Sequence, residues 1–372
     1  MKRYLIIILA LCAIGARAQV NANQQPFKTI YGDMQFNTPF YDQEDHWVVA
    51  GKNPKNNKYV FGMIYLDNTA GFTFRAEGLF GVDAQGHVFR DSSDYIKNGI
   101  LTTRITNSTN LICAIPDAML ADLKVQPVPD WLAVYHPATL DRNSNAYKIA
   151  HGRFLNSVKV PAKALQYLEP VYKTDPHATG LEYELSYAYN LLGRNAEAQA
   201  VLKSAIANAP DNSSLYAELG YAYIQGKDND KAVDIFLKGL ALAKQKNDNF
   251  FRSAMTTNLV LLYNELKQYD KAIATINQLL ADAPPAPNWY ILMATTYLKS
   301  NDNESAAKSY AKGIEVSNPA DMQGKAQLAY TVAILYRDKL SNTQQYTYWG
   351  QKAKEWAPVN TPVAKAANTL VF

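Results

Sequence analysis

Histidines and the acidic residues beside them are the groups in this sequence best suited to bind a metal ion or to transfer protons. The five histidines are His46, His87, His136, His151 and His177. No two of them are spaced to share one face of a helix, so a metal site would need distant parts of the chain to meet. The densest ionisable cluster of the N-terminal part is Glu44-Asp45-His46. It precedes a predicted strand at Trp47, which favours a solvated turn over a catalytic pair.

Motifs of known catalytic chemistry are missing from the sequence, which has no HExxH, GxSxG, GxxxxGK[ST] or paired-cysteine pattern. Gly78, Gly81 and Gly86 are close together, but strand-end glycines of hairpins explain them better than a nucleotide loop does. Asp228 and Asp230 resemble the start of a calcium loop and lack the rest of its pattern, so we interpret them as turn residues. The sequence therefore predicts a protein that is not an enzyme, with no catalytic residue, no metal and no cofactor.

The first 18 residues have the features of a secretory signal peptide. Lys2 and Arg3 precede an apolar run at 4–14, and Ala16-Arg17-Ala18 forms a small-residue cleavage site before Gln19. We expect the mature chain to be exported, to the periplasm or the medium of a bacterium, and to have no membrane span after cleavage. The alternative is a retained N-terminal anchor.

Charge and cysteine usage narrow the expected partners. Cleavage would remove three basic and no acidic residues, so the net charge would fall from 37 − 33 = +4 to 34 − 33 = +1. Lysine and arginine are scattered along the chain, which argues against a nucleic-acid partner. Cys113 would be the one remaining cysteine, and its apolar surroundings predict a buried, unreactive thiol.

A motif of about 34 residues recurs through the second half of the chain. Its clearest copy has Tyr216, Leu219-Gly220 and Tyr223, followed by Ala232 and then Phe236. The marker alanine recurs at 164, 198, 232, 272 and 306, with spacings of 34, 34, 40 and 34 residues. Such a fixed period is the signature of a repeat architecture.

Each copy reads as two helices joined by a turn, as in the periodic segments 181–192 and 196–207 separated by Gly193. Small residues in the first helix and the marker alanine in the second would let the two helices approach closely. The small residues of the first helices are Gly152, Ser186, Gly220 and Ala294. Prolines predicted to follow the ends of second helices are Pro176, Pro210 and Pro284.

Over residues 145–358 the sequence resembles the tetratricopeptide repeat family. The resemblance implies a mainly α fold, a right-handed superhelix of about six helical hairpins, with a concave groove lined by the first helices. Six extra residues near 243–250 are predicted to lengthen the flanking helices. The last copy departs from the pattern, having no marker alanine, as expected of a terminal repeat.

The N-terminal part differs and resembles no family known to us. Alternating hydrophobic residues at 58–66 and 72–80, separated by a turn, predict short antiparallel strands in a small β-rich α+β domain. A second turn at 83–86 leads into another strand at 87–90, and 116–123 is predicted as a short helix. The expected order is a signal peptide at 1–18, a flexible N-terminus at 19–26, the β-rich domain at 27–130, a linker at 131–144, the repeat array at 145–358 and a C-terminal capping helix at 359–372.

The phase of the repeat predicts which residues of the first helices face the groove. The candidates are Tyr183, Tyr187, Asn190, Ala217, Tyr221, Thr257, Leu261, Asn264, Ile291, Thr295 and Leu298. Family members that clamp a C-terminal carboxylate use Lys, Asn and Arg at these places, and Tyr183, Tyr187 and Thr257 depart from that set. A neutral lining with Tyr and Asn suits an extended apolar or mixed peptide. The alternative is that these tyrosines only pack between helices.

The sequence therefore favours an exported, non-enzymatic scaffold that binds a protein or peptide partner along its groove, with that partner in the cell envelope. One alternative is a structural subunit of a cell-envelope assembly. Another is an enzyme whose site lies in the N-terminal domain.

Overall fold

The computed structural model describes residues 23–91, 101–106, 108–137, 140–281 and 283–372. The predicted signal peptide, and half of the predicted flexible N-terminus (residues 19–22), lie outside these ranges. The chain divides into two compact units, Met1–Arg194 and Asn195–Phe372, which are described separately. Within the described ranges, the helices are all too short or too polar to cross a membrane.

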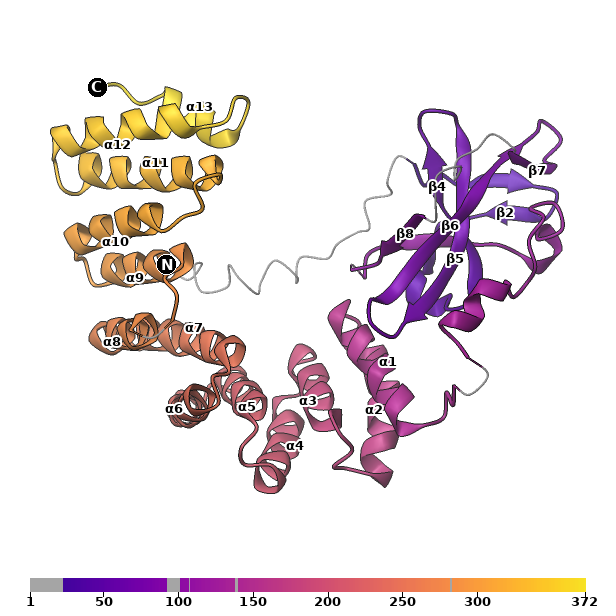
Figure 1. Cartoon of the computed structure of the whole chain (residues 1–372), viewed down its shortest axis with the longest axis horizontal. Coiled ribbons are helices and arrows are strands. Elements are labelled where there is room, and N and C mark those ends of the chain that lie inside the picture. The colour runs from indigo at the N-terminus through magenta and orange to yellow at the C-terminus, as the bar shows by residue number, and fades with distance from the viewer. Residues whose placement is uncertain (1–22, 92–100, 107, 138–139, 282) are drawn as a thin grey trace. The chain divides into compact units, whose positions relative to one another are not determined.

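Unit 1 begins with antiparallel strands, most of which form one sheet (Figure 1). The strand order is β3-β9-β4-β5-β6-β7, with β8 also paired to β6, while β1 and β2 form a separate ribbon. The strands are β1 (Phe27–Thr29), β2 (Gly32–Met34), β3 (Thr38–Pro39), β4 (His46–Asn53), β5 (Lys58–Asp67), β6 (Gly71–Val82), β7 (Val88–Asp91), β8 (Leu101–Arg104) and β9 (Leu111–Ala114).

The hairpin of β5 and β6 confirms the predicted strands and their turn. The Asp67 carboxylate accepts hydrogen bonds from the backbone N–H groups of Thr69 and Ala70, each at 2.7 Å. Gly71 closes the turn with φ of +84°, a conformation that glycine adopts without steric cost. The strands are in register from Asp67 opposite Gly71 onward, with a bulge after Phe61.

A large aromatic core covers the face of the sheet that includes Trp47, Phe61 and Phe80. Two short 3₁₀ segments, Asp117–Met119 and Asp130–Val134, pack onto this core. The predicted helix at 116–123 is thus only a short 3₁₀ turn. The first part of the segment predicted as a linker packs on the sheet, because its residues 131, 132 and 135 lie against the sheet core.

Cys113 is a free, buried cysteine on β9. Burial raises the pKa of its thiol to about 12. The predicted burial of this thiol is confirmed, and the raised pKa disfavours the thiolate, which is the reactive form.

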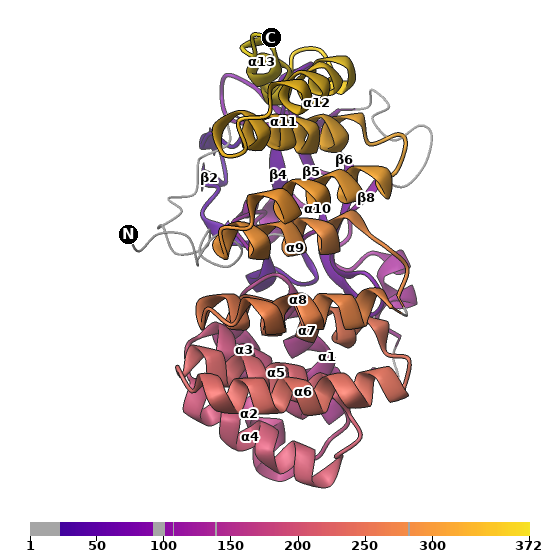
Figure 2. The ribbon, with the colours of Figure 1, turned by 90° about the vertical axis from the view of Figure 1, so that its left-hand side faces the viewer.

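The helices follow the strands. Unit 1 ends with α1 (Asn145–Ser157), α2 (Pro161–Thr174) and α3 (Leu181–Leu191). Unit 2 contains α4 (Asn195–Asn208), α5 (Ser213–Gln225), α6 (Asn229–Gln245), α7 (Asn249–Glu265), α8 (Tyr269–Leu280), α9 (Pro287–Lys299), α10 (Asn303–Glu315), α11 (Met322–Asp338), α12 (Thr343–Trp356) and α13 (Pro362–Asn368). Figure 2 shows α9 to α12 stacked one above another.

Helix ends fall where the sequence predicts them. Second helices α2, α4 and α8 end before Pro176, Pro210 and Pro284, respectively. Several first helices begin at side chains whose oxygens accept the N–H groups of the first turn, as Asp248 does for α7. The predicted terminal helix forms as α13, and the hydroxyl of Tyr346 on α12 donates to the Val371 carbonyl beyond it at 2.9 Å.

A left-handed residue recurs in the turn that follows each first helix. These residues are Lys159, Gly193, Lys227, Lys267, Asn301 and Ser341. Their spacings are 34, 34, 40, 34 and 40 residues, so the structure contains a second insertion that the marker alanines did not reveal. The first insertion lengthens α6 and α7 to 17 residues each, as predicted, and the second accompanies α11, which also has 17.

Small residues set the close approach of the paired helices. A Cβ at Gly152 would lie 2.6 Å from Leu168, and a Cβ at Gly220 would overlap the ring of Phe236. The marker alanine Ala232, on the helix that faces Gly220, is fully buried. The predicted role of these small residues is confirmed.

Replacing Gly220 by alanine should destabilise unit 2 by about 1 to 2 kcal/mol, because overpacking outweighs the gain in helix propensity. Gly313→Ala is the matched control, since a Cβ there meets only ordinary contacts from 3.5 Å outward. That variant should be stabilised by about 0.5 kcal/mol. Thermal melts followed by circular dichroism measure both, and equal shifts in the two variants would contradict the packing explanation.

Candidate functional site

A cluster of ionisable side chains lies inside unit 1, where the sheet meets α1. Glu44 and Asp45 come from the turn before β4, His136 from the segment after the sheet, and Tyr147 and His151 from α1. The side chains of Glu44 and Asp45 are only 13% and 18% exposed. The prediction of a solvated turn is therefore wrong, because the first helical hairpin covers this turn.

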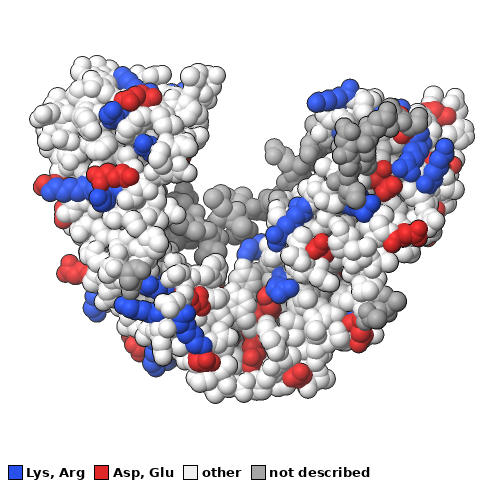
Figure 3. All heavy atoms as spheres, viewed as in Figure 1, with Lys and Arg blue, Asp and Glu red and all other residues white. Residues whose placement is uncertain are grey.

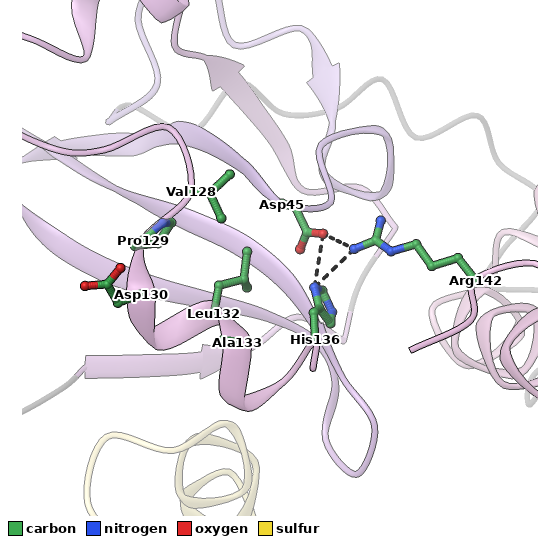
Figure 4. A pocket seen from close by; sticks show the side chains of 8 residues that line it. All are labelled: Asp45, Val128, Pro129, Asp130, Leu132, Ala133, His136 and Arg142. Atoms are coloured by element: carbon green, nitrogen blue, oxygen red, sulfur yellow. Dashed lines mark hydrogen bonds and ion pairs between the residues drawn. The ribbon is translucent and has the colours of Figure 1, made fainter. Parts of the chain in front are cut away.

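Asp45 is the centre of a three-residue network with His136 and Arg142 (Figure 4). Its Oδ2 atom lies 3.1 Å from His136 Nδ1 and accepts a hydrogen bond from Arg142 Nη2. Arg142 Nη2 also lies 3.1 Å from His136 Nδ1. Burial alone would raise the pKa of Asp45, but hydrogen bonds from His136 and Arg142 hold it below its ordinary value.

Backbone contacts hold the two sides of this network in place. Asp45 adopts a left-handed conformation with φ of 61°, and its N–H donates to the Ile64 carbonyl at 2.6 Å. His136 Nε2 lies 3.3 Å from the Leu66 carbonyl. Burial lowers the pKa of His136, but the hydrogen bond and the charge of Asp45 raise it overall. Both partners are therefore anchored on neighbouring parts of β5.

Glu44 links the turn to α1. Its Oε1 atom accepts a hydrogen bond from the Tyr147 hydroxyl at 3.0 Å, and its Oε2 atom lies 3.5 Å from His151 Nδ1. Burial, followed by the negative charge of Asp45, raises the pKa of Glu44. The carboxylate of Glu44 thus contacts the helix with both oxygens.

His151 is buried with a side chain only 2% exposed. Its ring stacks on Tyr167 with centroids 4.2 Å apart and meets the edge of Phe72 at 5.6 Å. Neither ring nitrogen has a hydrogen-bond partner, and burial lowers the pKa of the imidazole to about 4. His151 is therefore neutral near pH 7.

Apolar and ionic contacts close the junction around the cluster. A Cβ at Gly71 would lie 2.9 Å from the ring of Phe154 on α1, so the tip of the β5–β6 hairpin fits closely on this helix. On the other side, Lys163 of α2 forms an ion pair with Asp42. The β5–β6 hairpin thus contacts α1, and the segment between β3 and β4 contacts α2.

An open pocket of about 510 Å³ lies beside the network, as Figure 4 shows. Asp45, His136 and Arg142 form one side of it, and apolar side chains form much of the remainder. The other lining residues are Val128, Pro129, Asp130, Leu132 and Ala133. One end of the pocket is polar and charged and the other is largely apolar.

Sequence analysis missed this cluster because its members are far apart in the chain. The position of His151 was the one available signal. His151 precedes Gly152, which is predicted to face the second helix, so the side chain of His151 is expected at the edge of the buried face of α1. Nothing local indicated that Arg142 or Tyr147 would meet Glu44 and Asp45.

The predicted groove residues lie on first helices of the repeats. Tyr183, Tyr187 and Asn190 are on α3, in unit 1. The remaining candidates are in unit 2, on α5 (Ala217 and Tyr221), α7 (Thr257, Leu261 and Asn264) and α9 (Ile291, Thr295 and Leu298). The tyrosines, the threonines, Leu261, Ile291 and Leu298 are partly exposed.

Three of these candidates are buried: Asn190, Ala217 and Asn264 are 5%, 7% and 3% exposed. The side-chain amide of Asn264 donates to the Thr296 hydroxyl at 2.9 Å and so ties α7 to α9. Asn264 therefore joins neighbouring repeats and presents little surface to a partner. Asn190 and Ala217, equally buried, also offer little contact area.

Two candidate tyrosines lie next to each other on α3. The rings of Tyr183 and Tyr187 are 6.3 Å apart at 14°, and the Lys159 amine donates to the Tyr187 hydroxyl. In unit 2 the Tyr221 hydroxyl accepts a hydrogen bond from the Gln225 amide at 2.9 Å. Figure 3 shows basic and acidic side chains interspersed on the visible face.

Comparison with known sequences agrees with the helical pairs. Residues 160–219 and 191–249 match the model of the tetratricopeptide repeat. Helices α2 to α6 therefore belong to tetratricopeptide repeats. The chain is 29% identical over 128 residues to subunit 3 of the anaphase-promoting complex of Schizosaccharomyces pombe, which covers 34% of this chain and 18% of that protein.

Two further proteins are similar to parts of this chain. A heat shock protein of Saccharomyces cerevisiae is 26% identical over 118 residues, covering 31% of this chain and 19% of its own length. The structure of a thermophilic tetratricopeptide repeat protein from Thermus thermophilus aligns over 51% of this chain and 100% of its own, with 22% identity and a TM-score of 0.39. The chain thus spans less than a fifth of the length of both curated relatives.

Replacing Gly71 by alanine should loosen the contact between the sheet and α1. The left-handed backbone should cost about 1 to 2 kcal/mol, and the contact with Phe154 should add about 1 to 3 kcal/mol. Gly193→Ala is the matched control, because Gly193 also has positive φ (+72°) and a Cβ there meets no atom within 4 Å. Urea denaturation followed by tryptophan fluorescence measures both variants, and equal losses of stability would show that the Phe154 contact contributes nothing.

Proposed function

We propose that the protein is an exported, non-enzymatic scaffold that binds a polypeptide partner on the surface presented by the first helices of its repeats. The observation that carries the proposal is the match to tetratricopeptide repeats together with the partly exposed aromatic residues at the predicted binding positions. Aromatic side chains contribute much contact area at a small cost in conformational entropy.

The tyrosine pair on α3 supports binding of an extended peptide. Tyr183 and Tyr187 are stacked with nearly parallel rings, so they form a continuous aromatic surface. The Lys159 amine lies 4.9 Å from the centre of the Tyr187 ring and contacts its hydroxyl, which fixes the orientation of that ring. A surface that is already ordered loses less entropy when a partner binds.

Uncharged positions on the other first helices fit the same kind of partner. Leu261 on α7 and Ile291 and Leu298 on α9 are partly exposed apolar residues. Thr257 and Thr295 use their hydroxyls within their own helices, donating to the carbonyls of Ser253 and Ile291. These positions therefore favour a partner segment with apolar side chains over one with many charges.

Combining Tyr187→Ala with Tyr221→Ala should reduce partner capture about tenfold or more, because buried aromatic contacts dominate such interfaces. The thermal melt should stay nearly unchanged, since both side chains are partly exposed. Affinity capture from envelope extracts of the natural host, with quantitative mass spectrometry, measures the effect. Tyr348→Ala is the matched control, because Tyr348 is a 50% exposed tyrosine on the second helix α12.

Each outcome of this capture experiment has a distinct meaning. Loss in the double variant and retention in Tyr348→Ala supports the proposal. Capture that is equal in all three proteins, or a collapsed melt of the double variant, contradicts it. A single stoichiometric envelope partner would favour a permanent subunit of an envelope assembly, whereas several partners below stoichiometry would favour a scaffold.

Export makes a separate prediction. The pattern of residues 1–18 supports cleavage before Gln19. The protein isolated from its host should therefore begin at Gln19 and be found outside the cytoplasm. Mass spectrometry of the N-terminal peptide after cell fractionation measures this, and a cytoplasmic chain that still contains residues 1–18 would contradict export.

A further inference from the structure

We propose that Glu44, Asp45 and His136 form a binding site for a divalent transition-metal ion, with Zn²⁺ as the best match, at the junction of the sheet and α1. One possible ligand atom from each of these residues lies within 4.8 Å of those of the other two. The site is independent of the repeat surface proposed to bind a polypeptide.

The orientation of His136 suits a metal ligand. Its Nε2 atom faces the Leu66 carbonyl at 3.3 Å and donates its N–H there. Nδ1 hydrogen-bonds Asp45 Oδ2, 3.1 Å away, and an ion bound at Nδ1 would replace the proton of that hydrogen bond. In metal sites the second nitrogen of a histidine ligand usually makes such a hydrogen bond, which fixes the ring.

The orientation of Glu44 is fixed in the same way. The Tyr147 hydroxyl donates to Oε1 at 3.0 Å, which holds one carboxylate oxygen and restrains the other. Ligating carboxylates are commonly oriented by a hydrogen bond of this kind. Two of the three proposed ligands thus already have supporting contacts.

Polar atoms without partners provide an independent observation. Both ring nitrogens of His151 and the Oδ1 atom of Asp45 are buried and lack a hydrogen-bond partner. His151 is only 2% exposed, and its Nδ1 atom lies 3.5 Å from the Oε2 atom of Glu44. Buried polar atoms are rarely left unpaired. An ion bound by Glu44, or a water on that ion, would give His151 Nδ1 a partner.

In the structure, the guanidinium of Arg142 lies next to two of the proposed ligands, Asp45 and His136. Its guanidinium contacts Asp45 Oδ2 and lies 3.1 Å from His136 Nδ1, so it supplies positive charge to the proposed ligands. Its side chain is 49% exposed and comes from the loop before α1, which leaves it free to move into solvent. Binding would therefore exchange one positive group for another.

The donor set determines the preferred ion. One imidazole nitrogen and two carboxylates suit Zn²⁺ and similar transition-metal ions, whereas Ca²⁺ and Mg²⁺ prefer sites made entirely of oxygen. Glu44 also bonds to Tyr147, so a bound ion would strengthen the attachment of the sheet to α1.

Isothermal titration of the purified, untagged protein with ZnCl₂ tests the proposal. One ion should bind per chain, and His136→Gln should weaken the binding about tenfold or more. Arg142→Gln should tighten the binding, because it removes the competing cation. His177→Gln is the matched control. It removes a 43% exposed histidine that follows α2 and is no part of the cluster, so this variant should bind Zn²⁺ like the unchanged protein.

Three results would overturn the proposal. The first is that neither the unchanged protein nor Arg142→Gln binds Zn²⁺ saturably. The second is that His136→Gln binds Zn²⁺ as tightly as the unchanged protein. The third is that the unchanged protein binds Ca²⁺ as tightly as Zn²⁺. Circular dichroism shows whether His136→Gln is folded. If it is not, Asp45→Asn takes its place, with the same expected loss of binding.

Discussion

The close approach of paired helices is the contact on which the repeat array depends. Gly220 leaves room for the ring of Phe236, and the marker alanines on the second helices are fully buried. Because each hairpin contacts mainly its neighbours, the same small contact must recur in every repeat for the stack to form. The recurring left-handed residue in each turn shows the same regularity in the backbone. Insertions are tolerated because they lengthen helices such as α6 and α7 and leave this contact in place.

The junction of the sheet and the first hairpin depends on a different kind of contact. Burying the carboxylates of Glu44 and Asp45 is costly unless each finds a partner, and Tyr147, His136 and Arg142 supply those partners. The apolar contacts of Gly71 with Phe154, together with the ring of Phe72 against His151, exclude water around them. Polar and apolar contacts thus fix the first hairpin on the sheet together.

The two proposed binding sites lie in different parts of the protein. The partly exposed tyrosines belong to the repeats and suit an extended polypeptide, which requires contact area. The buried cluster at the junction suits a single ion, which requires oriented donor atoms. The hydrogen bond from Asn264 to Thr296 shows that a polar residue at a groove position can instead join neighbouring repeats, and Asn190 is equally buried, so repeat phase alone overstates the binding surface.

The sequence by itself determined the helices, the hairpin of β5 and β6 and the close contacts of Gly220, because these depend on local periodicity, turn chemistry and a fixed repeat. The tertiary structure alone decided the burial of Glu44 and Asp45, the packing of residues 130–135 on the sheet core and the position of His151. It also revealed the second insertion, where Tyr346 replaces the marker alanine. The burial of Glu44 and Asp45, the packing of residues 130–135 and the position of His151 depend on contacts between residues about 65 to 110 positions apart, and local pattern carries no information on such contacts.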